Sequence, residues 1–177
     1  VYIGVNMDVV LFGPPGAGKG TQAAHICSIL GITHVSTGDL FRNLDPESEV
    51  GKLAKSYMDA GQLVPDEVTV RVLAERLKDD DVQSGVLLDG FPRTISQALA
   101  LDKLLDKKKI ILDKVIEIRV DEEILLSRIE KRANETVNKR SDDNSEILIK
   151  RLEIYKHDTK PLIPFYQKQG KLVTVDG

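Results

Sequence analysis

Asp8-Val9-Val10-Leu11-Phe12-Gly13-Pro14-Pro15-Gly16-Ala17-Gly18-Lys19-Gly20-Thr21 is the stretch from which the architecture of the chain can be worked out. It opens with a short apolar, β-branched run, Asp8 to Phe12, which is typical of a strand buried on both faces of a sheet. A turn rich in glycine and proline follows. The next residues, Lys19 to Leu30, have the length of a helix, and Gly31 supplies its end. Strand, turn and helix in direct succession predict the first unit of a parallel α/β sheet.

The same alternation continues along the 177 residues. Further strands are expected at Thr33 to Val35, Val86 to Asp89, Lys114 to Val120 and Lys171 to Val175, with helical stretches between them. Helix starts are marked by Asp66, Thr94, Asp121 and Ser141, each followed by residues suited to a first helical turn. The pattern predicts one α/β domain, a parallel β-sheet flanked by helices, without repeats or linkers.

The turn after the first strand has the composition of a phosphate-binding loop. Its candidate nucleotide-binding residues are Gly16, Ala17, Gly18, Lys19, Gly20 and Thr21. The glycines allow backbone conformations that turn successive N–H groups toward one anion, and the following helix N-terminus adds partial positive charge. Lys19 then reaches the outer phosphates. The alternative, a glycine-rich turn that binds nothing, does not require a lysine at this position.

Magnesium is the cofactor expected beside a bound nucleoside triphosphate. The residue after Lys19 is Gly20 and the hydroxyl comes one place later at Thr21, so this loop is not expected to bind the metal directly. An apolar strand that ends in Asp89 offers a carboxylate near the phosphates. We expect Asp89 to hold Mg²⁺ through water.

The composition limits the classes of binding partner that can be expected besides a nucleotide. A net charge of −3 with interspersed acids and bases gives no indication of a nucleic-acid or membrane-surface partner. Cys27 is the only cysteine, which excludes an intramolecular disulfide and a thiolate zinc cluster and fits a cytoplasmic location. His25, His34 and His157 lack ligand spacing and are interpreted as surface or packing residues. No signal or anchor pattern is visible, which also fits the cytoplasm. We expect a monomer without structural zinc.

Four stretches together resemble the adenylate kinases, in their short-lid type, within the nucleoside monophosphate kinase family. They are Gly13 to Thr21, Ser36-Thr37-Gly38-Asp39-Leu40-Phe41-Arg42, Leu88-Asp89-Gly90-Phe91-Pro92-Arg93-Thr94 with Gln97, and a terminal set of arginines. The likeness runs from Met7 to Gly177. It implies reversible, Mg²⁺-dependent phosphoryl transfer from ATP to AMP, giving two ADP and balancing the adenine nucleotides.

The resemblance also implies how the single domain is divided. The three-layer core of P-loop nucleotide-binding proteins would comprise residues 7–36, 82–132 and 141–177. A helical AMP-binding insert is expected at about 37–78 and a short lid at about 133–140. Long-lid members carry a small β subdomain at the lid, and the seven residues between Arg132 and Arg140 leave no room for one.

The arginines fit phosphoryl transfer, in which the protein mainly positions the reactants and neutralises charge. By resemblance, Arg42 and Arg93 hold the acceptor phosphate, and Arg128, Arg132, Arg140 and Arg151 surround the donor and transferring phosphates. Arg128 and Arg132 lie four residues apart and would share a helix face. Arg140 and Arg151 lie eleven apart and would align if one helix extends back to Arg140. The alternative is a pair of solvated charged faces. Asp142 and Asp143 have at most a supporting role.

The acceptor base is expected to be read by Thr37 and Gln97, since a side-chain amide offers a donor and an acceptor together. The AMP-binding set implied by the resemblance is completed by Arg42, Leu63, Val64, Gly90, Arg93, Arg140 and Arg151. Two local explanations stay open. Thr37 could cap a helix that begins near Gly38, and Gln97 could turn back to the Thr94 backbone in a capping box.

Two other functions remain possible from the sequence. The chain could be a UMP or CMP kinase of the same family, although pyrimidine kinases usually carry alanine and asparagine in place of Thr37 and Gln97. It could also be a nucleotide-binding regulatory module without turnover. Retention of Lys19, Asp89 and all six arginines argues against that second alternative.

Overall fold

The computed structural model describes residues 6–134 and 144–177, and its described part is built on one parallel sheet of five strands in the order β2-β3-β1-β4-β5. The strands are β1 (Val9–Phe12), β2 (Thr33–Ser36), β3 (Val86–Asp89), β4 (Lys114–Arg119) and β5 (Leu172–Asp176). Each coincides with a predicted strand to within one residue at either end. The expected parallel α/β fold is therefore confirmed.

The first strand divides the core between the two faces of the sheet. Val9 and Leu11 pack in one cluster with Ala23 of the first helix, whereas Val10 and Phe12 pack in the other with Leu101. Side chains alternate across a strand, so an uninterrupted apolar run must bury both faces. All four residues of β1 are buried, as the sequence predicts.

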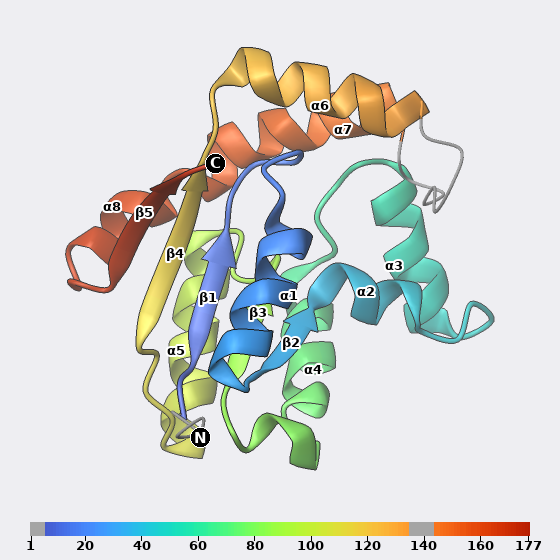
Figure 1. Ribbon diagram of the computed structural model, residues 1–177. Coiled ribbons are helices and arrows are strands. Elements are labelled where there is room, and N and C mark those ends of the chain that lie inside the picture. Colours follow the sequence, from blue (N-terminus) through green and yellow to red (C-terminus); the bar gives the residue numbers. More distant parts are fainter. Residues whose placement is uncertain (1–5, 135–143) are drawn as a thin grey trace.

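Helices cover both faces of the sheet (Figure 1). The cluster of Val9 and Leu11 includes residues of α1 (Lys19–Leu30), α6 (Glu122–Asn134) and α7 (Ser145–Ile154). The cluster of Val10 and Phe12 includes residues of α4 (Asp66–Arg76), α5 (Ile95–Lys108) and α8 (Leu162–Gln167). The remaining elements are α2 (Thr37–Arg42), α3 (Glu49–Asp59), a 3₁₀ turn η1 (Asp80–Val82) and a π-helical turn η2 (Tyr155–Thr159). A three-layer arrangement results.

The strand register brings three loops to one edge of the sheet. Asp89, the last residue of β3, pairs with Leu11 of β1 on one side and with Ser36 of β2 on the other. The segments that leave these strands, Gly13 to Gly18, Thr37 onward and Gly90 to Arg93, therefore start side by side. In Figure 1, α6 and α7 pass above this edge, and α2 and α3 extend beside it.

Some predicted helix ends differ from the observed ones. Helix α2 begins at Thr37, and Ser36 is its N-cap: the Ser36 hydroxyl accepts a hydrogen bond from the Asp39 N–H at 3.3 Å. The interpretation of Thr37 as the cap is therefore wrong, because the helix begins one residue earlier than the predicted start near Gly38. Helix α7 begins at Ser145 with Asn144 as its cap. The predicted start at Ser141 lies outside the described residues.

Helix α6 continues through Asn134, two residues into the segment 133–140 expected to form a short lid. Residues 135–140 of that segment, including Arg140, lie outside the described ranges, as do Asp142 and Asp143. Within residues 6–134 and 144–177, no helix is both long enough and apolar enough to span a membrane.

Candidate active site

A cleft of about 790 Å³ opens where the carboxyl ends of β1, β2 and β3 meet. Nearly all the candidate site residues line it, although they come from six separate parts of the chain. These are Gly16, Gly18, Lys19, Gly20, Thr21, Thr37, Arg42, Leu63, Val64, Asp89, Gly90, Arg93, Gln97, Arg128, Arg132 and Arg151. Ala17 is an exception, because it packs in the core cluster that includes Ile118 and does not line the cleft. Arg140 cannot be placed, since it lies outside the described residues.

The loop after β1 presents backbone to the cleft. Gly16 and Gly18 have φ angles of 83° and 87°, a left-handed conformation that glycine adopts without the strain of a Cβ atom. The Ala17 N–H donates to the Pro14 carbonyl at 3.1 Å, which closes the loop. Gly18 is the N-cap of α1 and supplies no side-chain cap. The first N–H groups of α1 are therefore available to an anion in the cleft.

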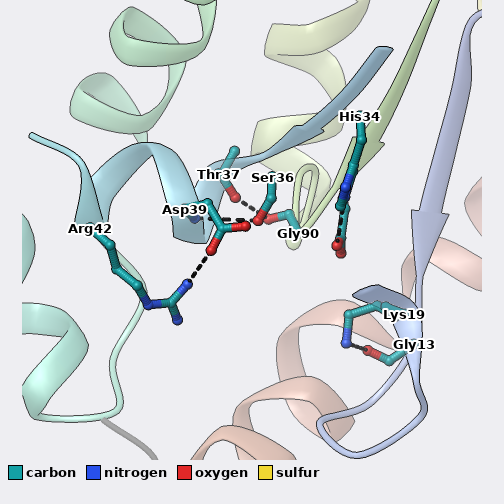
Figure 2. Close-up of polar contacts among 9 residues, drawn as sticks. Gly13, Lys19, His34, Ser36, Thr37, Asp39, Arg42 and Gly90 are labelled. Atoms are coloured by element: carbon teal, nitrogen blue, oxygen red, sulfur yellow. Dashed lines mark hydrogen bonds and ion pairs between the residues drawn. The ribbon is translucent and has the colours of Figure 1, made fainter. Parts of the chain in front are cut away.

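Lys19 lies over this loop (Figure 2). Its ammonium group donates to the carbonyls of Gly13 at 2.9 Å and Pro14 at 3.2 Å. Burial, together with the positive charges of Arg93, Arg132 and Arg151, lowers the pKa of Lys19 to about 8, although the charge of Asp89 opposes this shift. Cations thus face one another across the cleft.

Arg93 is subject to the same crowding. Its pKa is lowered to about 10 by burial and by the charges of Arg151 and Arg42, again opposed by Asp89. Such a concentration of positive charge is costly unless a multiply charged anion joins it. The electrostatics of the cleft therefore favour a ligand with several phosphate charges.

Backbone carbonyls hold several of these guanidinium groups. Arg93 Nε donates to the Gly90 carbonyl at 2.8 Å, and Arg128 Nη1 donates to the Gly16 carbonyl at 3.3 Å. Arg151 Nη2 donates to the Met58 carbonyl at 3.4 Å, which connects α7 with the end of α3. Arg42 instead forms an ion pair with Asp39, with Nη1 and Oδ1 2.9 Å apart (Figure 2). The arginines are positioned from four different helices and loops.

Asp89 is the buried carboxylate of the cleft, with 8% exposure. Its Oδ2 accepts a hydrogen bond from His34 Nε2 at 3.1 Å. Burial alone would raise the pKa of Asp89, but the hydrogen bond from His34 and the nearby charge of Lys19 outweigh this and leave it lowered. The carboxylate therefore stays ionised.

One ionised carboxylate suits Mg²⁺, which keeps several of its water ligands and needs few protein groups. Among the described residues, no three or more His, Cys, Asp or Glu side chains form a group that could hold a metal by themselves. Asp89 thus fits a metal that arrives with a nucleotide rather than a closed protein site.

His34 is a site residue that the sequence analysis missed. The spacing of the three histidines suggests a surface or packing residue, yet the His34 ring lines the cleft and contacts Asp89. The alternation of side chains along a strand could have indicated this role, because it places His34 and Ser36 on the face of β2 opposite the buried Val35. The register that brings this face beside Asp89 was not readable from the sequence.

Thr37 and Gly90 meet on the other side of the cleft. The buried Thr37 hydroxyl donates to the Gly90 carbonyl at 3.0 Å (Figure 2). Gly90 has a φ of 81°, and a Cβ atom there would lie 2.9 Å from Arg93 Nη2 and 3.0 Å from Thr37 Oγ1. Only glycine lets these side chains approach so closely.

The Gln97 side chain is held differently from the predicted capping box. Thr94 caps α5 as expected, since its Oγ1 accepts from the Gln97 N–H at 3.1 Å. The reciprocal bond to the Thr94 backbone is a wrong prediction: Gln97 Oε1 accepts instead from the Arg93 N–H at 2.8 Å. Gln97 Nε2 donates to Asp66 Oδ1 at 2.8 Å. The amide is 2% exposed and lines the cleft beside Leu63 and Val64.

Comparisons with known proteins agree with this geometry. A family model described as "Adenylate kinase" matches residues 11–171. A protein of Parvibaculum lavamentivorans named adenylate kinase is 51% identical over 173 residues, covering 97% of this chain and 84% of the relative. An adenylate kinase of Alkaliphilus oremlandii is 47% identical over 197 residues, covering 97% and 91%. One of Thermobifida fusca is 50% identical over 171 residues, covering 96% and 89%.

Proposed function

The chain belongs to the adenylate kinase family and transfers a phosphoryl group from ATP to AMP, and from this premise we propose how its own residues share the work. The relatives' names do not favour the pyrimidine monophosphate kinase or the module without turnover. The support for each role is the position of its side chain in the cleft and the chemistry of that side chain.

The donor phosphates bind over the loop from Gly16 to Thr21. Backbone N–H groups at the start of α1 face the anion, and Lys19 exchanges the carbonyls of Gly13 and Pro14 for phosphate oxygens. Arg128 and Arg132 approach from α6, above the loop. A bound triphosphate would restore the pKa of Lys19 toward its ordinary value, because an anion favours the charged amine.

The acceptor binds on the side of α2 to α4. Arg42 and Arg93 hold its phosphate, while Thr37, Gly90 and Gln97 form the base pocket with Leu63 and Val64. The support is that all of these line one cleft with the phosphate loop. Residues 37–78 would then act as the AMP-binding insert.

The observation that carries this proposal is that Lys19, Arg93, Arg132 and Arg151 all line one cleft. Arg93, Arg132 and Arg151 each depress the pKa of that lysine, so all of them lie within electrostatic reach of the same point. Charge that develops on a transferring phosphoryl group at this point is stabilised by preorganised donors. Arg140 belongs to the proposed set by resemblance only.

Adenylate kinases generally use Mg²⁺ with ATP, and Asp89 is the residue proposed to hold it, through water. When bound, the ion neutralises charge on the donor phosphates. The chain's own contribution is to keep Asp89 ionised by means of His34 and Lys19. Among the described residues, Asp89 is the buried carboxylate that lines the cleft.

The proposal extends to the state and location of the protein. Residues of a single chain are sufficient to form the cleft, and the protein is proposed to act as a monomer. The net charge of −3 supports neither a nucleic acid nor a membrane as partner, and a single cysteine fits the cytoplasm. Residues 133–140 are proposed to cover the reactants and exclude water.

The test is an assay of ADP formation from ATP with AMP, UMP or CMP, each with and without Mg²⁺. AMP should be the preferred acceptor, and chelation of the metal should abolish turnover. Arg93→Ala should lower kcat by about 10³-fold or more, whereas Arg71→Ala, which removes an exposed arginine of α4, should leave it unchanged. Preference for a pyrimidine nucleotide, or nucleotide binding without turnover, would overturn the proposal.

A further inference from the structure

The amide of Gln97 has a charged partner that lies behind the cleft. Gln97 lines the cleft, and its Nε2 donates to Oδ1 of Asp66, the first residue of α4, at 2.8 Å. The other carboxylate oxygen, Asp66 Oδ2, accepts from the Ser96 hydroxyl at 2.6 Å. Asp66 is not among the residues that line the cleft. It therefore touches the proposed base reader from the side away from the ligand.

Two contacts with opposite requirements fix the orientation of this amide. An ionised carboxylate only accepts hydrogen bonds, so the group facing Asp66 must be the NH₂ end of Gln97. A backbone N–H only donates, so the group facing Arg93 N must be the carbonyl oxygen, at 2.8 Å. Turning the amide over would place donor against donor at Arg93 and acceptor against acceptor at Asp66.

The fixed amide still has capacity for a ligand. After these two contacts, Oε1 keeps one lone pair and Nε2 keeps one hydrogen. A 6-aminopurine presents a donor, its exocyclic NH₂, beside an acceptor, N1. A 6-oxopurine presents the reverse, an acceptor oxygen beside an N1–H donor. An amide that cannot turn over can match the first pattern and not the second.

We propose that Asp66 is a positioning residue for acceptor selection: together with the Arg93 N–H it holds the Gln97 amide in one orientation, so that the cleft accepts a 6-aminopurine monophosphate and rejects a 6-oxopurine monophosphate. This inference rests on the proposed role of Gln97 in reading the acceptor base. A site whose buried polar groups would be left unpaired by the wrong ligand discriminates strongly against it.

A purely structural role for Asp66 predicts no change in the preference between the two purines. A carboxylate in a first helical turn stabilises the helix dipole, and the bond to Ser96 joins α4 to α5. Loss of either effect would weaken every acceptor to the same extent. Only loss of amide orientation changes the ratio between the two purines, so the ratio separates the explanations.

Asp66→Asn is the main test, because asparagine keeps the shape but can either donate to or accept from Gln97. The measured quantity is kcat/KM for AMP divided by kcat/KM for IMP. We expect this ratio to fall about tenfold, equivalent to about 1.4 kcal/mol, with the change mainly in the KM for each monophosphate. Asp66→Ser, with a hydroxyl that also donates or accepts and suits a helix start, should act in the same direction.

Two variants serve as matched controls. Glu67→Gln removes a neighbouring charge from the same first turn of α4, at an exposed position. Ser96→Ala removes the second bond to Asp66 and leaves the bond to Gln97. Both should keep the AMP to IMP ratio of the parent.

The outcomes distinguish this inference from the function on which it rests. If Gln97→Ala leaves the ratio unchanged, the proposed reading of the base by Gln97 is wrong, and the role of Asp66 falls with it. If Gln97→Ala lowers the ratio but Asp66→Asn and Asp66→Ser do not, only the role of Asp66 is wrong. Equal losses for AMP and IMP in the Asp66 variants would assign Asp66 to structure alone.

Discussion

His34 Nε2 lies 3.1 Å from Asp89 Oδ2, a contact that joins β2 to β3 in the lining of the cleft. The His34 ring is labelled in Figure 2. The parallel register makes this contact possible: His34 pairs with Leu87 and Ser36 pairs with Asp89, so His34 and Asp89 lie on the same face of the sheet. The imidazole compensates part of the desolvation of a carboxylate that is only 8% exposed.

Replacement of His34 should therefore destabilise the fold. His34→Leu leaves the buried carboxylate without this donor and should reduce the free energy of unfolding by about 1–3 kcal/mol. His34→Gln retains an N–H donor and should recover most of the loss. Urea unfolding at pH 7 measures both, and equal stability of the two variants would contradict the assigned contact.

The contact between His34 and Asp89 also predicts how the stability of the fold changes at low pH. The pKa of Asp89 is lowered from its ordinary 3.8, so near that pH the folded state binds fewer protons than the unfolded chain. The stability contributed by the ionised carboxylate is present above about pH 3.8 and is lost as the pH falls through the lower folded value. His34→Leu weakens that shift, and its acid-unfolding midpoint should move to higher pH. An unchanged midpoint would show that His34 does not stabilise the ionised form.

Replacement of Lys19 should separate activity from stability. Lys19→Met should lower kcat by about 10³-fold or more, since the loop loses its phosphate-binding cation. Because the pKa of Lys19 is lowered to about 8, its charge opposes folding below that pH, and this penalty is relieved only as the pH rises toward 10.5. At pH 7 the variant should therefore be as stable as the parent or slightly more stable. Lys168→Met, at an exposed site, is the control.

The lowered pKa of Lys19 also predicts a pH profile for the donor. The free protein loses the proton of Lys19 above about pH 8, so kcat/KM for ATP should fall in that range. The fall should approach tenfold per pH unit, as for loss of a single proton. At saturating ATP, the alkaline fall in kcat should occur at higher pH, because bound phosphates favour the ammonium form of Lys19. If Lys19→Arg retains measurable activity and its kcat/KM for ATP falls over the same pH range, the titrating group is not Lys19.

The strands and the phosphate loop could be read from the sequence because their signals are local. A β-branched apolar run predicts β1, and Gly16, Gly18 and Lys19 need only their neighbours to form a loop ahead of α1. Helix α1 itself was predicted with its observed ends, Lys19 and Leu30, since Gly31 stops it with a φ of 69°.

The remaining features of the site depend on contacts between distant segments. Asp66 and Gln97 are 31 residues apart, and His34 and Asp89 are 55 apart. No periodicity within one element predicts that such pairs meet, because the meeting is set by strand register and by the packing of α4 against α5. Thr37 shows a smaller limit: a one-residue error in the predicted start of α2 assigned the capping role of Ser36 to its neighbour.

Gly90 offers the sharpest test of the acceptor side of the cleft. A Cβ atom at this position would lie 2.9 Å from Arg93 Nη2 and 3.0 Å from Thr37 Oγ1, so Gly90→Ala must displace one of them. The backbone φ of 81° adds strain of about 1–2 kcal/mol for any residue with a Cβ. We expect lower stability together with a KM for AMP raised about tenfold or more.

Gly170→Ala separates these two effects. Gly170 has a φ of 67°, and nothing lies within 4 Å of the position of an added Cβ, so its substitution adds backbone strain without crowding. Gly90→Ala should therefore lose more stability than Gly170→Ala in urea unfolding, and only Gly90→Ala should bind AMP more weakly. ATP should bind equally well to both, because Gly90 lies on the acceptor side. A KM for AMP that is the same in both variants would mean that Arg93 and Thr37 do not hold the acceptor.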